Sequence, residues 1–149
     1  PPLKVKFKAI LLMGGIYDLD VLIKGPKFFG GIPKTAQLIF GDFPLKYNMS
    51  NIKEYPYIEY LSPSAFVNEN WCDTCMSWSI YDILCPNQGE AMARIVKKYA
   101  PHFETFVFKT IQNNHCFHLD FGHSKVAMGC MRHSLAFLER IFSEDTVEV

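Results

Sequence analysis

The stretch Cys75-Met-Ser-Trp-Ser-Ile-Tyr-Asp82-Ile-Leu-Cys-Pro-Asn-Gln88 decides the predicted fold. Its first half is apolar and aromatic enough to form a short buried strand. Asp82 follows where that strand should end, and Pro86 favours a turn beyond it. In open parallel α/β sheets, ligands bind at the carboxyl ends of the strands, so an acid at this position is a candidate functional group. A structural role for Asp82, as the end of the strand or the cap of the next helix, is the alternative.

The segments around this stretch predict strands that alternate with helices. Residues 3–13 become continuously apolar from Ala9 to Met13, which is typical of an interior strand of a parallel sheet. Residues 18–64 are broken by glycines and prolines and predict an excursion from the framework. A helix is expected over 87–100 and a strand over 104–111. The apolar face of that helix comprises Ala91, Met92, Ile95, Val96 and Tyr99.

A final helix is predicted over 124–142, with Ser124 as its N-cap. Its inward-facing residues are expected to be Ala127, Cys130, Met131, Leu135, Leu138 and Phe142. The order strand, excursion, strand, helix, strand, helix indicates right-handed parallel crossovers. The sequence therefore predicts an α/β fold in which helices cover a parallel sheet, with residues 1–149 forming one domain.

Composition restricts the class of protein. The chain has 149 residues, of which 49% are hydrophobic and 20% charged, so it can bury a substantial core. Fifteen basic and fifteen acidic residues leave no net charge, which argues against nucleic acid or an anionic membrane as a partner. No apolar run reaches the roughly 18 to 20 residues of a membrane span. We expect a soluble protein of the cytoplasm.

The five cysteines do not predict a disulfide framework, because the chain has an ordinary core and an odd number of them. Cys72 and Cys75 have the spacing of a zinc or redox motif, and His115 with His118 offers a second pair of zinc ligands. The second pair lies farther along the chain than in common zinc fingers, and Cys75 enters a strand. A redox pair normally opens a helix. We therefore expect no metal site.

A loop at 112–122, Gln-Asn-Asn-His-Cys-Phe-His-Leu-Asp-Phe-Gly, follows the strand after Asp82. Neighbouring parallel strands end at the same edge of the sheet, so a histidine of this loop can meet Asp82. A carboxylate that orients an imidazole forms two thirds of a catalytic triad, in which the histidine takes the proton of a nucleophile. Considered singly, a loop histidine is more often solvated, and the prediction rests on the pairing.

Three stretches of the chain resemble the α/β-hydrolase family, and within it the kynurenine formamidase (arylformamidase) and esterase branch. They are Ala9-Ile-Leu-Leu-Met-Gly-Gly-Ile-Tyr-Asp-Leu19, Leu61-Ser-Pro63 and Asp82-x-x-x-Pro86-x-Gln88. The His118-Leu-Asp-Phe121 stretch is similar to the family's histidine segment. The resemblance implies the C-terminal half of the hydrolase fold, and the order Asp82 before His118 matches its triad order.

The nucleophile of that family is missing from the chain. No Gly-x-Ser-x-Gly and no oxyanion-hole segment is present. Because the chain also starts abruptly with Pro-Pro-Leu, we expect it to be the C-terminal part of a longer hydrolase. The resemblance then implies an aryl formamide or ester, such as N-formylkynurenine, as the small-molecule substrate, with no cofactor. A non-catalytic interaction module on a degenerate hydrolase fold is the alternative, and a homodimer is left open.

His118 is the predicted base and Asp82 the acid that orients it. His118 is preferred because the residues after it match the family's segment, and because Cys116 and Phe117 can turn it toward the crevice. His115 lies closer to the preceding strand and is the alternative base, whereas His123 is expected to face solvent. We expect a His118 ring nitrogen within roughly 2.6–3.2 Å of an Asp82 carboxylate oxygen.

Overall fold

The computed structural model describes residues 6–18, 62–82, 87–109, 117–119, 122 and 124–143. Most of the predicted excursion at 18–64, Pro86, His115 and His123 therefore lie outside the described residues. In chain order the described elements are β1 (Ala9–Met13), the 3₁₀ helix η4 (Pro63–Phe66), β2 (Asp73–Ser79), α3 (Gln88–Val96), β3 (Phe103–Phe108), the 3₁₀ helix η5 (Phe117–Leu119) and α4 (Lys125–Ser143).

The three described strands form a parallel sheet in the order β1-β2-β3. Leu11 of β1 lies opposite Cys75 of β2, and Cys75 lies opposite Glu104 of β3. Six of the seven residues of β2 are buried, as expected for a strand with a neighbour on each side and a helix on each face. The predicted α/β fold is confirmed.

The predicted position of the first strand differs from the structure in one respect. Within the described part of the chain β1 is an edge strand of the sheet, not an interior one. All five residues of β1 are half-buried, because helices cover both faces of the sheet. Cover on both faces explains the continuous apolar run in the sequence, and it does not require a neighbouring strand on both edges.

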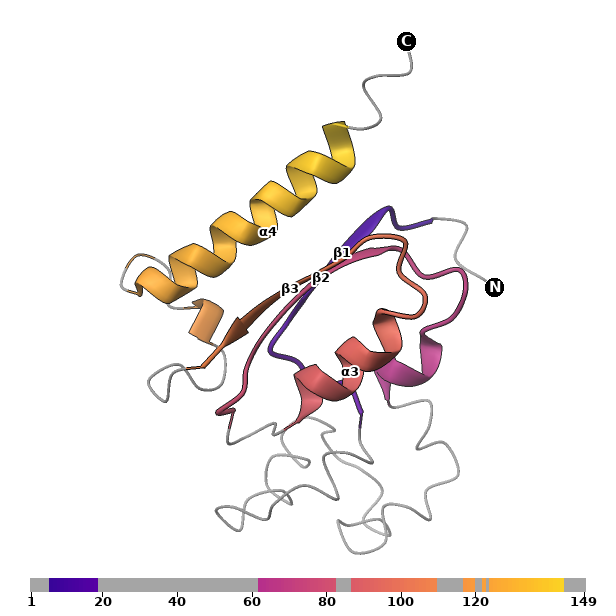
Figure 1. Ribbon diagram of the computed structural model, residues 1–149, viewed down its shortest axis with the longest axis horizontal. Coiled ribbons are helices and arrows are strands. Elements are labelled where there is room, and N and C mark those ends of the chain that lie inside the picture. The colour runs from indigo at the N-terminus through magenta and orange to yellow at the C-terminus, as the bar shows by residue number, and fades with distance from the viewer. Residues whose placement is uncertain are drawn as a thin grey trace, which may run out of the picture.

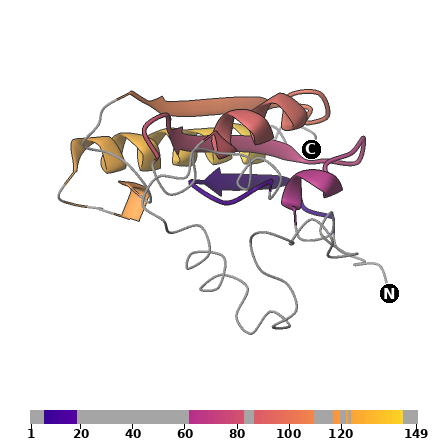
Figure 2. The ribbon, with the colours of Figure 1, turned by 90° about the horizontal axis from the view of Figure 1, so that it is seen from below.

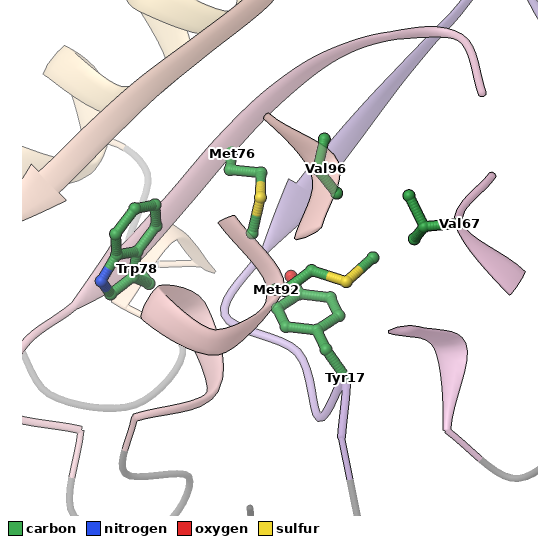
Figure 3. Packing of buried hydrophobic residues seen from close by; sticks show 6 residues of the cluster. All are labelled: Tyr17, Val67, Met76, Trp78, Met92 and Val96. Atoms are coloured by element: carbon green, nitrogen blue, oxygen red, sulfur yellow. The ribbon is translucent and has the colours of Figure 1, made fainter. Parts of the chain in front are cut away.

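Helices α3 and α4 lie on opposite faces of the sheet (Figures 1 and 2). On the α3 side the core comprises Tyr17, Val67, Met76, Trp78, Met92 and Val96 (Figure 3). On the α4 side Cys75 packs with Phe137 and Ile141. Successive side chains of β2 therefore alternate between the two cores, because those of a strand point to opposite faces. Among the described helices, none has the length and apolar character that a membrane span needs.

Helix α3 is shorter than the predicted helix over 87–100 and ends at Val96. Met92 and Val96 face the core as predicted, whereas Tyr99 is 41% exposed because it lies in the turn after the helix. The close approach of α3 to β2 depends on Gly89. A Cβ atom at this position would lie 2.1 Å from Cγ of Trp78, so a larger residue cannot pack here without a shift. Trp78 Nε1 also donates a 2.9 Å hydrogen bond to Glu90.

Helix α4 begins where the sequence predicts. The Ser124 hydroxyl accepts a hydrogen bond from the Ala127 N–H at 3.3 Å, which is the expected N-cap interaction. Its buried residues are Ala127, Cys130, Ser134, Phe137 and Ile141. The prediction that Leu135 and Phe142 face inward is wrong, because they are 51% and 52% exposed. The helix instead packs on the sheet through the buried residues just named, which have the same spacing but lie on a neighbouring side of the helix.

Candidate functional site

The candidate site is the edge of the sheet at which the three parallel strands end. All three strands point toward the same end of the molecule, and η5 lies at that end (Figures 1 and 2). Residues 14–18 follow β1, Asp82 follows β2, and His118 belongs to η5, after β3. In sheets of this kind the carboxyl ends of the strands border the ligand-binding crevice.

Asp82 lies three residues beyond the end of β2, as the sequence predicts. A tight turn carries it, because its backbone N–H donates to the carbonyl oxygen of Ser79 at 3.3 Å. The Ser79 hydroxyl supports the same turn by accepting from the Tyr81 N–H at 3.2 Å. The Asp82 residue is only 8% exposed. A carboxylate held in a short turn and largely shielded from water suits an orienting role better than a solvated surface role.

His118 is the middle residue of η5, and this short helix packs against α4. The side chain is partly buried and its Nδ1 atom is inaccessible to solvent. His118 and Asp82 thus follow adjacent strands at one edge of the sheet. Their hydrogen bond stays a prediction, as does the choice between His118 and His115, which lies outside the described residues.

Hydrogen bonds between Gln88 and the backbone of Tyr17 and Asp18 hold the turn that follows β1; we call this group of hydrogen bonds the Gln88 bracket. The Gln88 side-chain oxygen accepts from the backbone N–H groups of Tyr17 and Asp18, both at 2.8 Å. Its Nε2 donates to the Asp18 carbonyl oxygen at 2.8 Å. Gln88 is 1% exposed, so these hydrogen bonds satisfy polar groups that water does not reach.

Ser64, the residue directly after the Leu61-Ser-Pro63 stretch, also contacts Tyr17 and Asp18. Its backbone N–H donates to the Tyr17 carbonyl at 2.9 Å, and its hydroxyl donates to an Asp18 carboxylate oxygen at 3.3 Å. The stretches at 9–19 and 82–88 therefore meet around Tyr17 and Asp18, and the residue that follows Pro63 joins them. The contact between these stretches is not predictable from the local patterns of their sequences, because they lie far apart along the chain. One feature of the sequence does point to this contact: Gln88 is a polar residue at the start of α3, on the face whose other residues are apolar.

The cysteines of the described residues are free thiols. Cys75 is buried in β2, and burial raises the pKa of its thiol to about 11, although a hydrogen bond with Ser134 opposes the shift. Burial also raises the pKa of Cys72. Metal binding and thiol redox chemistry both need the thiolate, which these surroundings disfavour. In the described part of the chain no cluster of three or more potential metal ligands is present.

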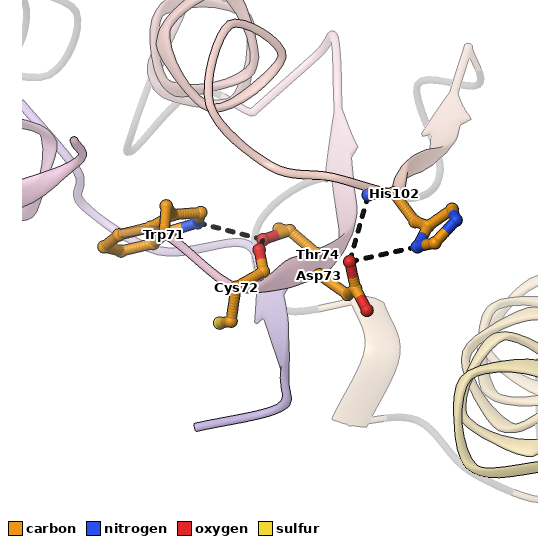
Figure 4. A network of polar contacts seen from close by, with 5 residues as sticks. All are labelled: Trp71, Cys72, Asp73, Thr74 and His102. Atoms are coloured by element: carbon orange, nitrogen blue, oxygen red, sulfur yellow. Dashed lines mark hydrogen bonds and ion pairs between the residues drawn. The ribbon is translucent and has the colours of Figure 1, made fainter. Parts of the chain in front are cut away.

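A second Asp–His pair lies at the opposite edge of the sheet (Figure 4). Asp73 Oδ1 is 3.1 Å from His102 Nδ1 and accepts the His102 backbone N–H at 3.0 Å, which ties the start of β2 to the start of β3. The His102 side chain is 56% exposed, and the Cys72 sulfur points away from the pair. A hollow of about 340 Å³ beside it is lined in part by Lys6 and Lys8. These two contacts to Asp73 join the strand ends and give the pair a structural role.

Comparisons with known proteins agree with the fold. No protein-family profile and no curated protein matches the chain. Among solved structures, the chain is similar to a thermophilic esterase, Est2, from the Planctomycetes species Thermogutta terrifontis, with a TM-score of 0.54 and 14% sequence identity. The match covers 90% of this chain and 42% of the esterase chain. At this identity the likeness shows the fold alone: the chain shares an esterase-type α/β fold over less than half the length of that enzyme.

Proposed function

We propose that this chain carries the acid and the base of a serine-type carboxylic ester or formamide hydrolase. The observation that carries the proposal is the placement of a buried Asp82 and of His118 after adjacent strands, at one edge of a sheet that matches an esterase fold. His118 accepts the proton of the attacking hydroxyl and then donates it to the leaving group. Asp82 orients the imidazole and stabilises its protonated form.

The nucleophile comes from a segment that this chain does not contain. The sequence lacks Gly-x-Ser-x-Gly. Ser77 and Ser79 lie within β2, and the Ser64 hydroxyl donates to Asp18, so none of them has the strand-to-helix turn that activates a nucleophilic serine. The match to 42% of an esterase chain leaves room for such a segment in a longer protein.

The proposed substrate is an aryl formamide or aryl ester, with N-formylkynurenine as the specific candidate. This assignment rests on the resemblance of the stretch at 9–19, of Leu61-Ser-Pro63 and of the Asp82 turn to the arylformamidase branch. The hydrogen bonds of Gln88 support it, because they join the stretch at 9–19 to the Asp82 turn, and Ser64, next to the Leu61-Ser-Pro63 stretch, contacts the same two residues.

The test is a comparison of alanine variants in a protein that contains this chain and an upstream Gly-x-Ser-x-Gly segment. We expect His118→Ala to lower kcat for N-formylkynurenine or an aryl ester by on the order of 10⁴, because the nucleophile loses its base. His115→Ala is the matched control from the same loop and should cost far less. The reverse ranking would move the base to position 115, and an unchanged kcat in both variants would refute the proposal.

A further inference from the structure

Helix α4 carries a second apolar stripe beside the one that packs on the sheet. Met128, Leu135 and Phe142 are 39%, 51% and 52% exposed, at a spacing of seven residues. Met131 and Leu138 are half-buried and lie between them, so the five residues repeat every three and four positions. This spacing is the pattern with which two helices pack along their length. We call these five residues the α4 stripe.

Contacts place the α4 stripe on the β1 side of the helix. Leu138 packs against the cluster of Cys75, Phe137 and Ile141, as Ala9 and Leu11 of β1 also do. The Lys8 ammonium lies 5.3 Å from the centroid of the Phe142 ring. On the opposite side of α4, Arg140 and His133 contact Glu104 of β3. Among the described elements η5 also packs against α4, but Met128, Leu135 and Phe142 keep the exposed fractions given above, and α4 is the outer layer on its side of the sheet (Figure 1).

A line of charged residues borders the stripe. Lys125, Arg132 and Glu139 are exposed and again seven residues apart. Arg132 and Glu139 have no ion-pair partner within the part of the chain that the structure describes. When two copies of α4 pack antiparallel, the same flank of each helix meets, so Arg132 of one copy lies beside Glu139 of the other. The pair forms twice, because such an interface is isologous.

We propose that the α4 stripe is a docking surface for a second copy of this chain, with the two α4 helices antiparallel and centred between Leu135 and Leu138. Apolar side chains at a and d positions then pack between the helices, and the two Arg132–Glu139 pairs fix the direction. The antiparallel arrangement also sets the N-terminal end of each helix dipole beside the C-terminal end of the other. This interface is separate from the proposed catalytic edge and does not depend on it.

The test is the molar mass of the purified 149-residue chain by sedimentation equilibrium. We expect a reversible dimer, and we expect Leu135→Glu to raise its dissociation constant at least about tenfold by placing a charge in the apolar seam. Tyr99→Glu is the matched control, because Tyr99 is a similarly exposed aromatic residue on the α3 side of the sheet. It should leave the dimer unchanged. Circular dichroism verifies that each variant is folded.

A charge exchange tests the direction of the helices. Arg132→Glu sets like charges side by side twice and should weaken the dimer about fivefold or more, whereas adding Glu139→Arg should restore most of the affinity. A monomer at about 100 µM would overturn the proposal and would mean that another segment covers the stripe. A dimer that withstands Leu135→Glu would also overturn it, as would a double charge variant that dimerises no better than Arg132→Glu alone.

Discussion

The contact between Gly89 and Trp78 determines how closely α3 can approach the sheet. A Cβ atom at position 89 would lie 2.1 Å from Cγ and 2.4 Å from Cδ2 of the Trp78 ring, which is 8% exposed. The ring cannot turn away without losing the 2.9 Å hydrogen bond from its Nε1 to Glu90. Gly89→Ala therefore has to move α3 away from β2 or displace the indole.

Three contributions set the expected magnitude. Inserting a methyl group into a packed core costs about 1–3 kcal/mol. Loss of the hydrogen bond to Glu90 adds about 1 kcal/mol. Alanine recovers up to about 1 kcal/mol relative to glycine through its higher helix propensity. We expect Gly89→Ala to lower the free energy of unfolding by about 2 kcal/mol, as the sum of these three effects.

Urea denaturation followed by far-ultraviolet circular dichroism measures this change. Gly129→Ala in α4 is the matched control, because its Cβ would lie 3.3 Å from Cζ of Phe106, a contact that a small adjustment relieves. Its stability should stay within about 1 kcal/mol of the original chain. If Gly89→Ala were as stable as the original chain, or lost no more stability than Gly129→Ala, the account of how α3 packs would be wrong.

Further predictions concern the bracket, the buried thiol and activity. Gln88→Leu leaves the N–H groups of Tyr17 and Asp18 without their acceptor and should cost about 3 kcal/mol in urea denaturation; an unchanged midpoint would contradict the bracket. Because the pKa of Cys75 rises from 9.0 to about 11 in the folded chain, the unfolded state loses its proton first. Stability should therefore fall as pH rises from 9.0 to about 11, and Cys75→Ala should reduce that fall; an identical pH profile for both proteins would refute this. The 149-residue chain alone should not hydrolyse aryl esters, since it lacks the nucleophile; turnover that Asp82→Asn abolishes would show otherwise.

The order of the elements could be predicted because local patterns determine it. The continuous apolar run before Met13 and the aromatic run before Asp82 both form strands, and the Ser124 cap marks the start of α4. The position of Asp82 beyond the end of β2 followed from the same patterns. These features depend on residues close together in sequence, so a single sequence contains the information.

The side of α4 that is buried could not be predicted in the same way. Two stripes of the helix have the spacing of a packing face, and the less apolar one faces the sheet. Ser134 is buried there at 1% exposure, beside the Cys75 thiol, while Leu135 is half-exposed. Local spacing does not distinguish the two stripes, so the choice depends on tertiary contacts such as the hydrogen bond between Ser134 and Cys75. The bracket around Gln88 was missed for a similar reason, because it joins residues 70 and 71 positions apart.

The most direct test of the proposed site is the distance between the imidazole of His118 and the carboxylate of Asp82 in a crystal structure of this chain. The account predicts a His118 ring nitrogen within roughly 2.6–3.2 Å of an Asp82 oxygen, with somewhat looser geometry in the absence of substrate. Finding His115 against Asp82, with His118 turned toward solvent, would contradict it.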